Sequence, residues 1–206
     1  MVRRAIRWPL LLRRRSVRLL LLAGGILFAL LELRQSPILQ PVAEPYQRQA
    51  YAHWQDLDGD CRDTRAEVLA RDSLAPVTWS GDGCQVLSGL WRDRWSGDEF
   101  RDPQALDIDH LVPLAEAHRS GADRWSPARR QAFANDMAGR PAALVAVSAA
   151  SNRSKADRDL VDWMPSDWHS WCAYGRDWRA VKRHWALRED WLERHWLDGL
   201  ARVCGD

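Results

Sequence analysis

The sequence lacks the paired cysteines of zinc-binding modules and the long apolar runs of membrane-embedded proteins. Its 206 residues include four cysteines, and none of them forms a C-x-x-C pair. A structural zinc site normally needs such a pair or a close Cys/His cluster, so zinc modules are disfavoured. The apolar run Leu19–Leu31 would span roughly 20 Å as a helix, less than the ~30 Å hydrocarbon core of a bilayer. No internal repeat or low-complexity segment is present, which disfavours repeat architectures.

Residues 35–206 also lack an excess of positive over negative charge. Residues 1–34 contain eight Arg and one Glu, a formal charge of +7, whereas the whole chain carries +2, which leaves about −5 for residues 35–206. The body therefore has no excess of positive charge to form a broad basic surface. Binding of nucleic acid would require a local cationic site and a metal ion.

The N-terminal segment predicts export. Arg-rich residues 3–18 precede the apolar run, as in the positive and hydrophobic regions of a signal peptide. No clean small-x-small cleavage site follows Leu31, so a cleaved signal and an anchor in the inner membrane through residues 10–33 both remain open. In either case the positive flank stays inside, and the body is periplasmic or extracellular.

The cysteines agree with export. An even set without metal-site spacing favours two disulfides formed in an oxidising compartment. Of the three possible pairings we favour Cys61–Cys84 and Cys172–Cys204, because each closes a modest loop within one half of the body. Each disulfide would add on the order of 3 kcal/mol by constraining the unfolded chain.

The body predicts an α+β fold. We expect a targeting segment over residues 1–35, a Pro-containing linker over 36–45 and one folded domain over 46–206. Expected helices cover residues 46–57, a segment opening at Asp63, residues 127–137 behind the cap Ser126, a short stretch entered at Ser151-Asn152, and one or two Trp-rich helices within 167–203. Expected strands cover residues 77–79, 85–87, 89–91, 106–112 and 144–147.

Two of these segments carry groups suited to phosphodiester hydrolysis. Asp109-His110 lies near the end of the 106–112 strand, and Asn152-Arg153-Ser154-Lys155 follows the 144–147 strand. An imidazole near its free pKa suits removal of a proton from water at neutral pH. Asp and Asn oxygens suit a hard cation, Mg²⁺ or Mn²⁺, and Arg153 and Lys155 can hold a phosphate.

These two stretches resemble the HNH nucleases, especially the secreted bacterial group related to the C-terminal domain of GmrSD-type restriction enzymes. The pieces Asp109-His110-Leu111-Val112-Pro113 and Asn152-Arg153-Ser154-Lys155 also look like the HNH domain of RNA-guided CRISPR nucleases. Further pieces of the secreted group's pattern extend the resemblance over roughly residues 56–190. They include the CRDTRAEVL run from Cys61, Ser120-Gly121-Ala122, Phe133-Ala134-Asn135-Asp136 and Trp163-Met164-Pro165.

The resemblance implies a small ββα-metal core wrapped by N- and C-terminal helices, and hydrolysis of DNA with little sequence preference. His110 would be the general base, Asp109 and Asn152 would hold one Mg²⁺ or Mn²⁺ ion, and Lys155 would lie near the phosphate. Many HNH proteins carry a central Asn that pins the loop after the catalytic His, but the matching place here is near Ala143. Asn135 or backbone groups would have to replace it.

Two other interpretations remain open. Asp56, Asp58 and Asp60 occupy calcium-loop positions 1, 3 and 5 with Glu67 at position 12, but Cys61 stands where the sharp turn requires Gly. A capped turn before a disulfide is therefore favoured over a calcium-stabilised structural protein. The acidic body and the missing central Asn are also compatible with an exported nucleic-acid-binding module that has lost turnover.

Overall fold

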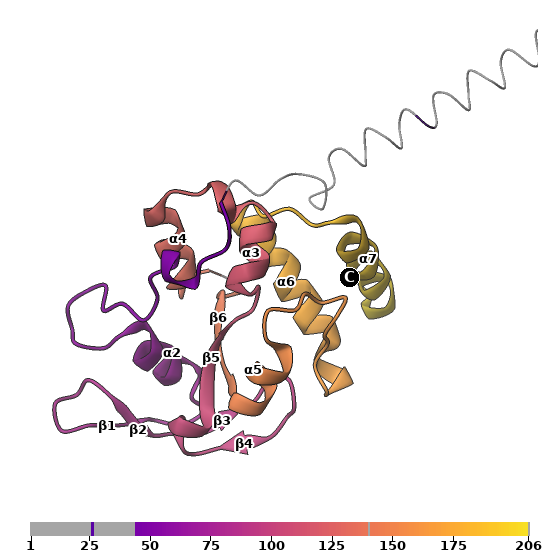
Figure 1. Ribbon diagram of the computed structural model, residues 1–206. Coiled ribbons are helices and arrows are strands. Elements are labelled where there is room, and N and C mark those ends of the chain that lie inside the picture. The colour runs from indigo at the N-terminus through magenta and orange to yellow at the C-terminus, as the bar shows by residue number, and fades with distance from the viewer. Residues whose placement is uncertain (1–25, 27–43, 140, 206) are drawn as a thin grey trace, which may run out of the picture. The chain divides into compact units, whose positions relative to one another are not determined.

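The computed structural model describes residues 26, 44–139 and 141–205 (Figure 1). The chain divides into two compact units, residues 1–41 and 42–206. Apart from Ile26, which is helical and exposed, the expected targeting segment and the expected anchor through residues 10–33 lie outside the described residues. No helix of the described part combines the length and the apolar character needed to cross a membrane.

The second unit is a mixed α/β fold, and its described strands form three two-stranded sheets. Figure 1 shows β5 and β6 side by side, with α2 and α5 on either side of the pair. In chain order the elements are η2 (Arg48–Ala50), α2 (Thr64–Asp72), β1 (Thr78–Trp79), β2 (Val86–Ser88), β3 (Trp91–Arg92), β4 (Glu99–Phe100), η3 (Pro103–Ala105), β5 (Leu106–His110), α3 (Leu114–Arg119), η4 (Ala122–Arg124), α4 (Pro127–Ala134), β6 (Leu144–Ser148), α5 (Ala149–Lys155), η5 (Trp168–Ser170), α6 (Trp171–Trp185) and α7 (Trp191–Cys204), where η marks 3-10 helices.

The β5–β6 pair forms the centre of the domain. The two strands run antiparallel in continuous register, from Leu106 opposite Ser148 to His110 opposite Leu144. Because successive side chains of a strand face opposite sides, β6 contributes to two cores. Leu144 and Ala146 pack with α2, whereas Val145 and Val147 pack with residues of α3, α4 and α6. Burial on both faces explains why β6 is a continuous hydrophobic run rather than an alternating one.

Most sequence-predicted strands are present with shifted ends. Strands expected at 77–79, 85–87 and 89–91 appear as β1, β2 and β3, while β4 was not predicted. The strand expected over 106–112 ends earlier, at His110, three residues before Pro113. A further helix, α3, begins directly after that proline and was missed, because its six residues are too few to show a clear helical period.

The helix expected over residues 46–57 is wrong. Only the three-residue turn η2 forms there. The backbone of the segment is instead held by the Asn135 side chain, which accepts from Gln55 N (3.2 Å) and donates to the Ala52 carbonyl (2.7 Å). These tertiary hydrogen bonds replace the local ones that a helix would supply.

The other predicted helices are present, and capping explains where they begin. Asp63 caps α2 by accepting from Ala66 N, and Ser126 caps α4 ahead of a first-turn proline. Helix α5 begins at Ala149, earlier than expected, because Ser148 at the end of β6 serves as its cap. Asn152 therefore lies inside this helix rather than at its start.

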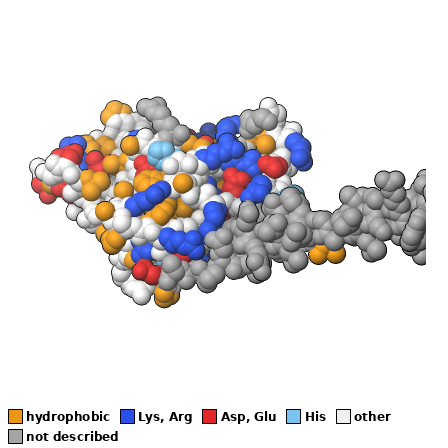
Figure 2. Space-filling model, turned by 90° about the horizontal axis from the view of Figure 1, so that it is seen from above, with side chains coloured by type: hydrophobic (Ala, Val, Ile, Leu, Met, Phe, Trp, Pro, Cys, Tyr) orange, Lys and Arg blue, Asp and Glu red, His pale blue; other side chains and the backbone are white. Residues whose placement is uncertain are grey.

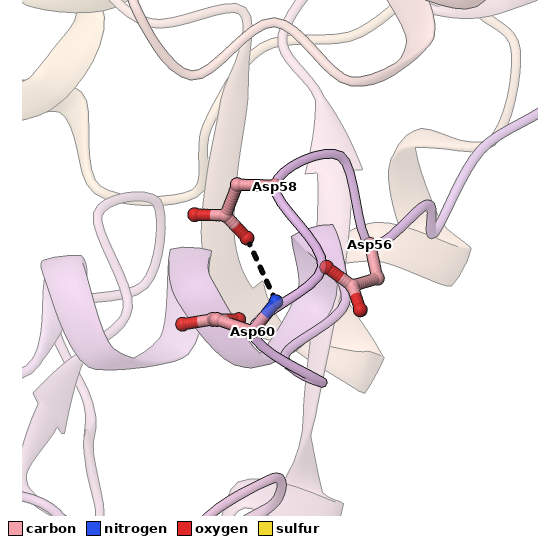
Figure 3. Close-up of side chains that lie close together, drawn as sticks. All are labelled: Asp56, Asp58 and Asp60. Atoms are coloured by element: carbon pink, nitrogen blue, oxygen red, sulfur yellow. Dashed lines mark hydrogen bonds between the residues drawn. The ribbon is translucent and has the colours of Figure 1, made fainter.

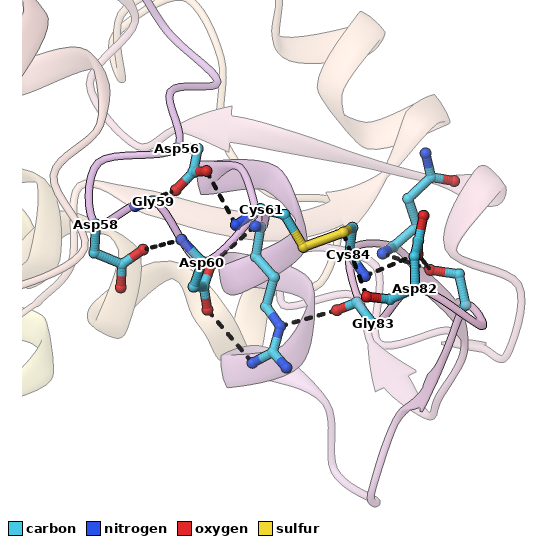
Figure 4. Close-up of a disulfide and its surroundings, with 11 residues drawn as sticks. Asp56, Asp58, Gly59, Asp60, Cys61, Asp82, Gly83 and Cys84 are labelled. Atoms are coloured by element: carbon cyan, nitrogen blue, oxygen red, sulfur yellow. Dashed lines mark hydrogen bonds and ion pairs between the residues drawn. A yellow bond between two sulfur atoms is a disulfide. The ribbon is translucent and has the colours of Figure 1, made fainter.

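Both predicted disulfides are confirmed. Cys61 and Cys84 connect the segment before α2 to the segment before β2, with Cα atoms 5.2 Å apart (Figure 4). Cys172 and Cys204 connect α6 to the end of α7, with Cα atoms 5.7 Å apart. The expected Trp-rich C-terminal segment is thus a pair of helices fastened by a covalent bond.

A buried ionic cluster attaches this helical pair to the domain core. Lys182 Nζ on α6 lies 2.8 Å from Glu116 on α3 and 2.6 Å from Glu193 on α7. All three side chains are buried. A buried cation needs such partners, so the cluster fixes α6 and α7 in one arrangement against α3.

Candidate functional site

A cavity of about 470 Å³ lies between the end of β5 and the C-terminal half of α5. Its lining includes four of the sequence-predicted site residues: Asp109, His110, Asn152 and Arg153. β5 supplies the first two and α5 supplies the others. Adjacent side chains of a strand normally face opposite sides, but His110 is the last residue of β5, so it and Asp109 can share one cavity. The structure therefore brings together the four residues that the sequence placed there.

Asp109 is held by Lys155 from the far end of α5. The Lys155 ammonium group lies 2.6 Å from Asp109 Oδ2 and 2.8 Å from the His110 carbonyl oxygen. It also sits 5.2 Å from the centroid of the Trp95 ring. Burial raises the pKa of Asp109 and lowers the pKa of Lys155, and their mutual attraction opposes both shifts.

The position of Lys155 differs from the expected phosphate contact. Its side chain is 0 % exposed and is not part of the cavity lining. The charge of Asp109 draws it inward, since a carboxylate buried among apolar groups requires a compensating cation. Lys155 therefore fixes Asp109 and the end of β5, while Arg153, which is exposed, is the α5 cation that reaches the cavity.

His110 is a buried, neutral imidazole with one defined tautomer. Its Nε2 lies 3.0 Å from the carbonyl oxygen of Ala134 at the end of α4. A carbonyl oxygen only accepts, so Nε2 carries the proton and Nδ1 keeps its lone pair. Burial lowers the pKa of His110 to about 3, with further lowering by the charges of Lys155 and Arg48. The ring is thus neutral at neutral pH, but burial places its pKa far below the near-free value on which the sequence-based expectation relied.

Asn152 is oriented by a residue that sequence reasoning did not select. Its Nδ2 donates to Asp107 Oδ2 at 3.0 Å. Because the amide nitrogen is used in this bond, the carboxamide oxygen Oδ1 is the atom of Asn152 that can bind a cation. Asp107 and Asp109 are two residues apart on β5 and therefore share a face. That spacing was the available signal for Asp107.

Asn135 does not occupy the place of the missing central Asn. Its side chain is hydrogen-bonded to the backbone of Gln55, Ala52 and Gln131 and to the Thr64 hydroxyl. Asn135 is also the C-cap residue of α4. The loop after His110 is instead pinned by backbone, because Leu111 N donates to the Ala143 carbonyl at 2.8 Å.

The donor set fits a hard divalent cation. One carboxylate oxygen of Asp109 is taken by Lys155, which leaves Oδ1 without that partner, and Asp109 and Asn152 both line the same cavity. Mg²⁺ is typically held by one or two protein oxygens, with water and substrate phosphate completing an octahedron. Asp109 and Asn152 are the residues that would hold it.

A second, exposed group of acidic side chains lies away from this cavity. Asp56, Asp58 and Asp60 are the one set of three or more His, Cys, Asp or Glu within the described residues whose ligand atoms lie within 4.8 Å of one another (Figure 3). Their carboxylates accept backbone N–H bonds: Asp56 from Gly59 (2.8 Å) and Cys61 (3.0 Å), and Asp58 from Asp60 (3.2 Å) (Figure 4). These bonds form a capped turn before the disulfide.

Charge is mixed on the surface. On the face shown in Figure 2, Lys and Arg side chains lie among hydrophobic ones, with acidic side chains beside them. The net charge of residues 35–206 is nevertheless about −5. Attraction of an anion would therefore require a local excess of positive charge at the cavity.

Comparison with known proteins gives one informative relative. No protein-family model matches the chain, and no solved structure matches it. A protein of Arthroderma benhamiae named "Uncharacterized secreted protein" is 35% identical over 159 residues, which cover 77% of this chain and 76% of that protein. The aligned region therefore covers most of both chains. The chain belongs to the same protein family as this uncharacterized secreted protein of Arthroderma benhamiae.

Proposed function

We propose that this protein is an exported HNH endonuclease that hydrolyses phosphodiester bonds in DNA with the help of one Mg²⁺ or Mn²⁺ ion. The pair β5–β6 followed by α5 would be its ββα-metal core. One observation carries the proposal: Asp109, His110 and Asn152, which come from two elements, line one cavity. A buried base beside two hard oxygen donors is the combination that the reaction needs.

His110 is the general base. Its Nε2–H is fixed by the Ala134 carbonyl, so the Nδ1 lone pair accepts the proton of the attacking water. The rings of Phe133 and Trp54, with centroids 6.1 and 6.3 Å away, limit its rotation. Because the ring is neutral, His110 does not have to lose a proton before it can accept one from water.

Asp109 and Asn152 would hold the cation, and Lys155 and Asp107 orient these two side chains. When bound, a divalent cation would supply charge neutralisation at the phosphate oxygens and at the leaving 3′-oxygen. Arg153 binds the phosphate from the exposed side of α5.

Export is supported by two independent findings. Both disulfides are of the kind that persists in an oxidising compartment. The relative from Arthroderma benhamiae is a secreted protein by name. The Arg-rich and apolar N-terminal segment would supply the signal, and retention in a membrane fraction would identify residues 10–33 as an anchor.

Plasmid nicking tests the proposal. Wild type with Mg²⁺ or Mn²⁺ should cleave supercoiled DNA, EDTA should stop cleavage, and His110→Ala should lower the rate by roughly 10²–10⁴-fold. His184→Ala, at an exposed histidine of α6, is the matched control and should cleave like wild type. Equal cleavage by wild type and His110→Ala would refute the assignment. DNA binding without cleavage would instead identify a non-catalytic binding module.

A further inference from the structure

Residues 44–55 run as an extended strap across α3 and α4. At its start the Glu44 carboxylate pairs with Arg130 of α4 at 2.9 Å, and the Glu44 carbonyl bonds His118 Nε2 at 2.7 Å. The buried ring of Tyr51 follows, and its hydroxyl bonds His118 Nδ1 at 3.0 Å. The strap is therefore anchored to both helices.

The far end of the strap is fixed as well. Asn135 binds the backbone of Ala52 and Gln55, and the Gln55 carbonyl accepts from Thr64 at the start of α2. Between these anchors lies η2, whose first residue is Arg48. The backbone position of Arg48 is thus determined by the strap's contacts before and after η2, and not by η2 alone.

Arg48 projects into the same cavity as Asp109, His110, Asn152 and Arg153, and its side chain is exposed. Its charge lowers the pKa of both Asp109 and His110, although burial has the larger effect on each. No ion pair within the described residues involves Arg48. Tyr46, two residues before Arg48 on the strap, also lines the cavity.

We propose that Arg48 is a further catalytic residue, which binds the non-bridging oxygens of the scissile phosphate and stabilises the charge that builds on them during hydrolysis. This inference rests on the proposed nuclease function. A guanidinium group presents paired N–H donors that match two oxygens of a phosphate, and it stays charged at all working pH values. The strap would thus complete a site whose other cation, Arg153, comes from α5.

The test compares Arg48→Ala and Arg48→Lys with Arg101→Ala, an exposed arginine outside the cavity lining that controls for net charge. With Mg²⁺, Arg48→Ala should lower kcat for plasmid cleavage by about 100-fold or more. Arg48→Lys should recover only part of this loss, because an ammonium group cannot replace the planar fork. Arg101→Ala should keep kcat, and unchanged melting temperatures would show that all three variants fold.

A binding measurement separates failure of this inference from failure of the proposed function. In the His110→Ala background with Mg²⁺, Arg48→Ala should reduce the salt dependence of DNA affinity by about one unit of slope, and Arg101→Ala should not. If wild type cleaves DNA and Arg48→Ala cleaves equally well, the inference is overturned and the nuclease function stands. If wild type does not cleave DNA, the binding measurement still decides the inference. An unchanged salt dependence of DNA affinity on adding Arg48→Ala to the His110→Ala background then overturns the proposed contact between Arg48 and phosphate.

Discussion

Replacing Lys155 by Met removes the cation that compensates a buried carboxylate. Met has a similar length, so the change deletes charge and hydrogen bonds with little loss of packing. In the native protein Lys155 Nζ bonds Asp109 Oδ2 at 2.6 Å and the His110 carbonyl oxygen at 2.8 Å. After the substitution both acceptors remain buried without this donor.

The expected cost in unfolding free energy is large. Breaking a buried ion pair by removing one partner costs about 3–5 kcal/mol, because the remaining charge is left in a poorly polar environment. An exposed pair would cost below about 1 kcal/mol. Lys155 is 0 % exposed and Asp109 is 6 % exposed, so the larger range applies.

The loss should depend on pH with a defined sign. Burial raises the pKa of Asp109 above its unfolded value, and removal of Lys155 removes the strongest opposing influence. For such a group, stability is fully present below the unfolded pKa of about 3.9 and is lost as pH rises through the folded pKa. The deficit of Lys155→Met relative to wild type should therefore be smallest near pH 4, where the lost hydrogen bond to the His110 carbonyl remains, and largest at neutral pH.

Urea denaturation followed by tryptophan fluorescence measures this deficit at each pH. The double variant Lys155→Met/Asp109→Asn removes both charges and should recover about 2 kcal/mol relative to Lys155→Met alone. A deficit under about 1 kcal/mol at pH 7 would show that the pair is solvated. The argument that Lys155 holds Asp109 in place would then fail.

Two more predictions concern the support of the site and of the C-terminal helices. Asp93→Asn should cost about 1–3 kcal/mol at pH 7 in urea denaturation, because Asp93 Oδ2 accepts from Ser148 N (3.2 Å) and Ser151 Oγ (2.6 Å) at the start of α5. Burial raises the pKa of Asp93, but these hydrogen bonds prevail and leave the pKa lowered. The contribution of Asp93 to the unfolding free energy is therefore present above about pH 3.9 and is lost as pH falls through the folded pKa. A deficit of Asp93→Asn relative to wild type that persists at pH 2 would contradict this. Cys172→Ser/Cys204→Ser opens a loop with a sequence separation of 32 and should lower the unfolding free energy by about 3.5 kcal/mol, whereas a change below about 1 kcal/mol would show that the α6–α7 contacts suffice alone.

The part of the site that is local in sequence was predictable. Asp109 and His110 lie at the end of a strand that is followed by a proline, and Asn152 and Arg153 lie on the helix that follows the next strand. Strand pairing then brings these residues together without further information. The disulfides were predictable for a similar reason, since loop length alone favoured the observed pairing.

The strap and the inward course of Lys155 could not be read from the sequence in the same way. Residues 46–57 have local preferences compatible with a helix, and the hydrogen bonds of Asn135 that override them come from a residue about 80 positions away. Whether Lys155 reaches phosphate or Asp109 depends on the depth of the cavity, which the sequence does not contain. Both misses are tertiary effects acting on weak local signals.

The charges of the cavity explain how an acidic body can serve an anionic substrate. In and directly behind the lining, three cations stand against three carboxylates: Arg48, Arg153 and Lys155 against Asp107, Asp109 and Asp157. This balance gives no net attraction for a phosphate, and a body charge of about −5 opposes it. A divalent cation held by Asp109 and Asn152 would change the balance to a net positive charge at the place where phosphate must bind. In the proposed function, the same ion that activates the phosphate therefore also admits it to the site.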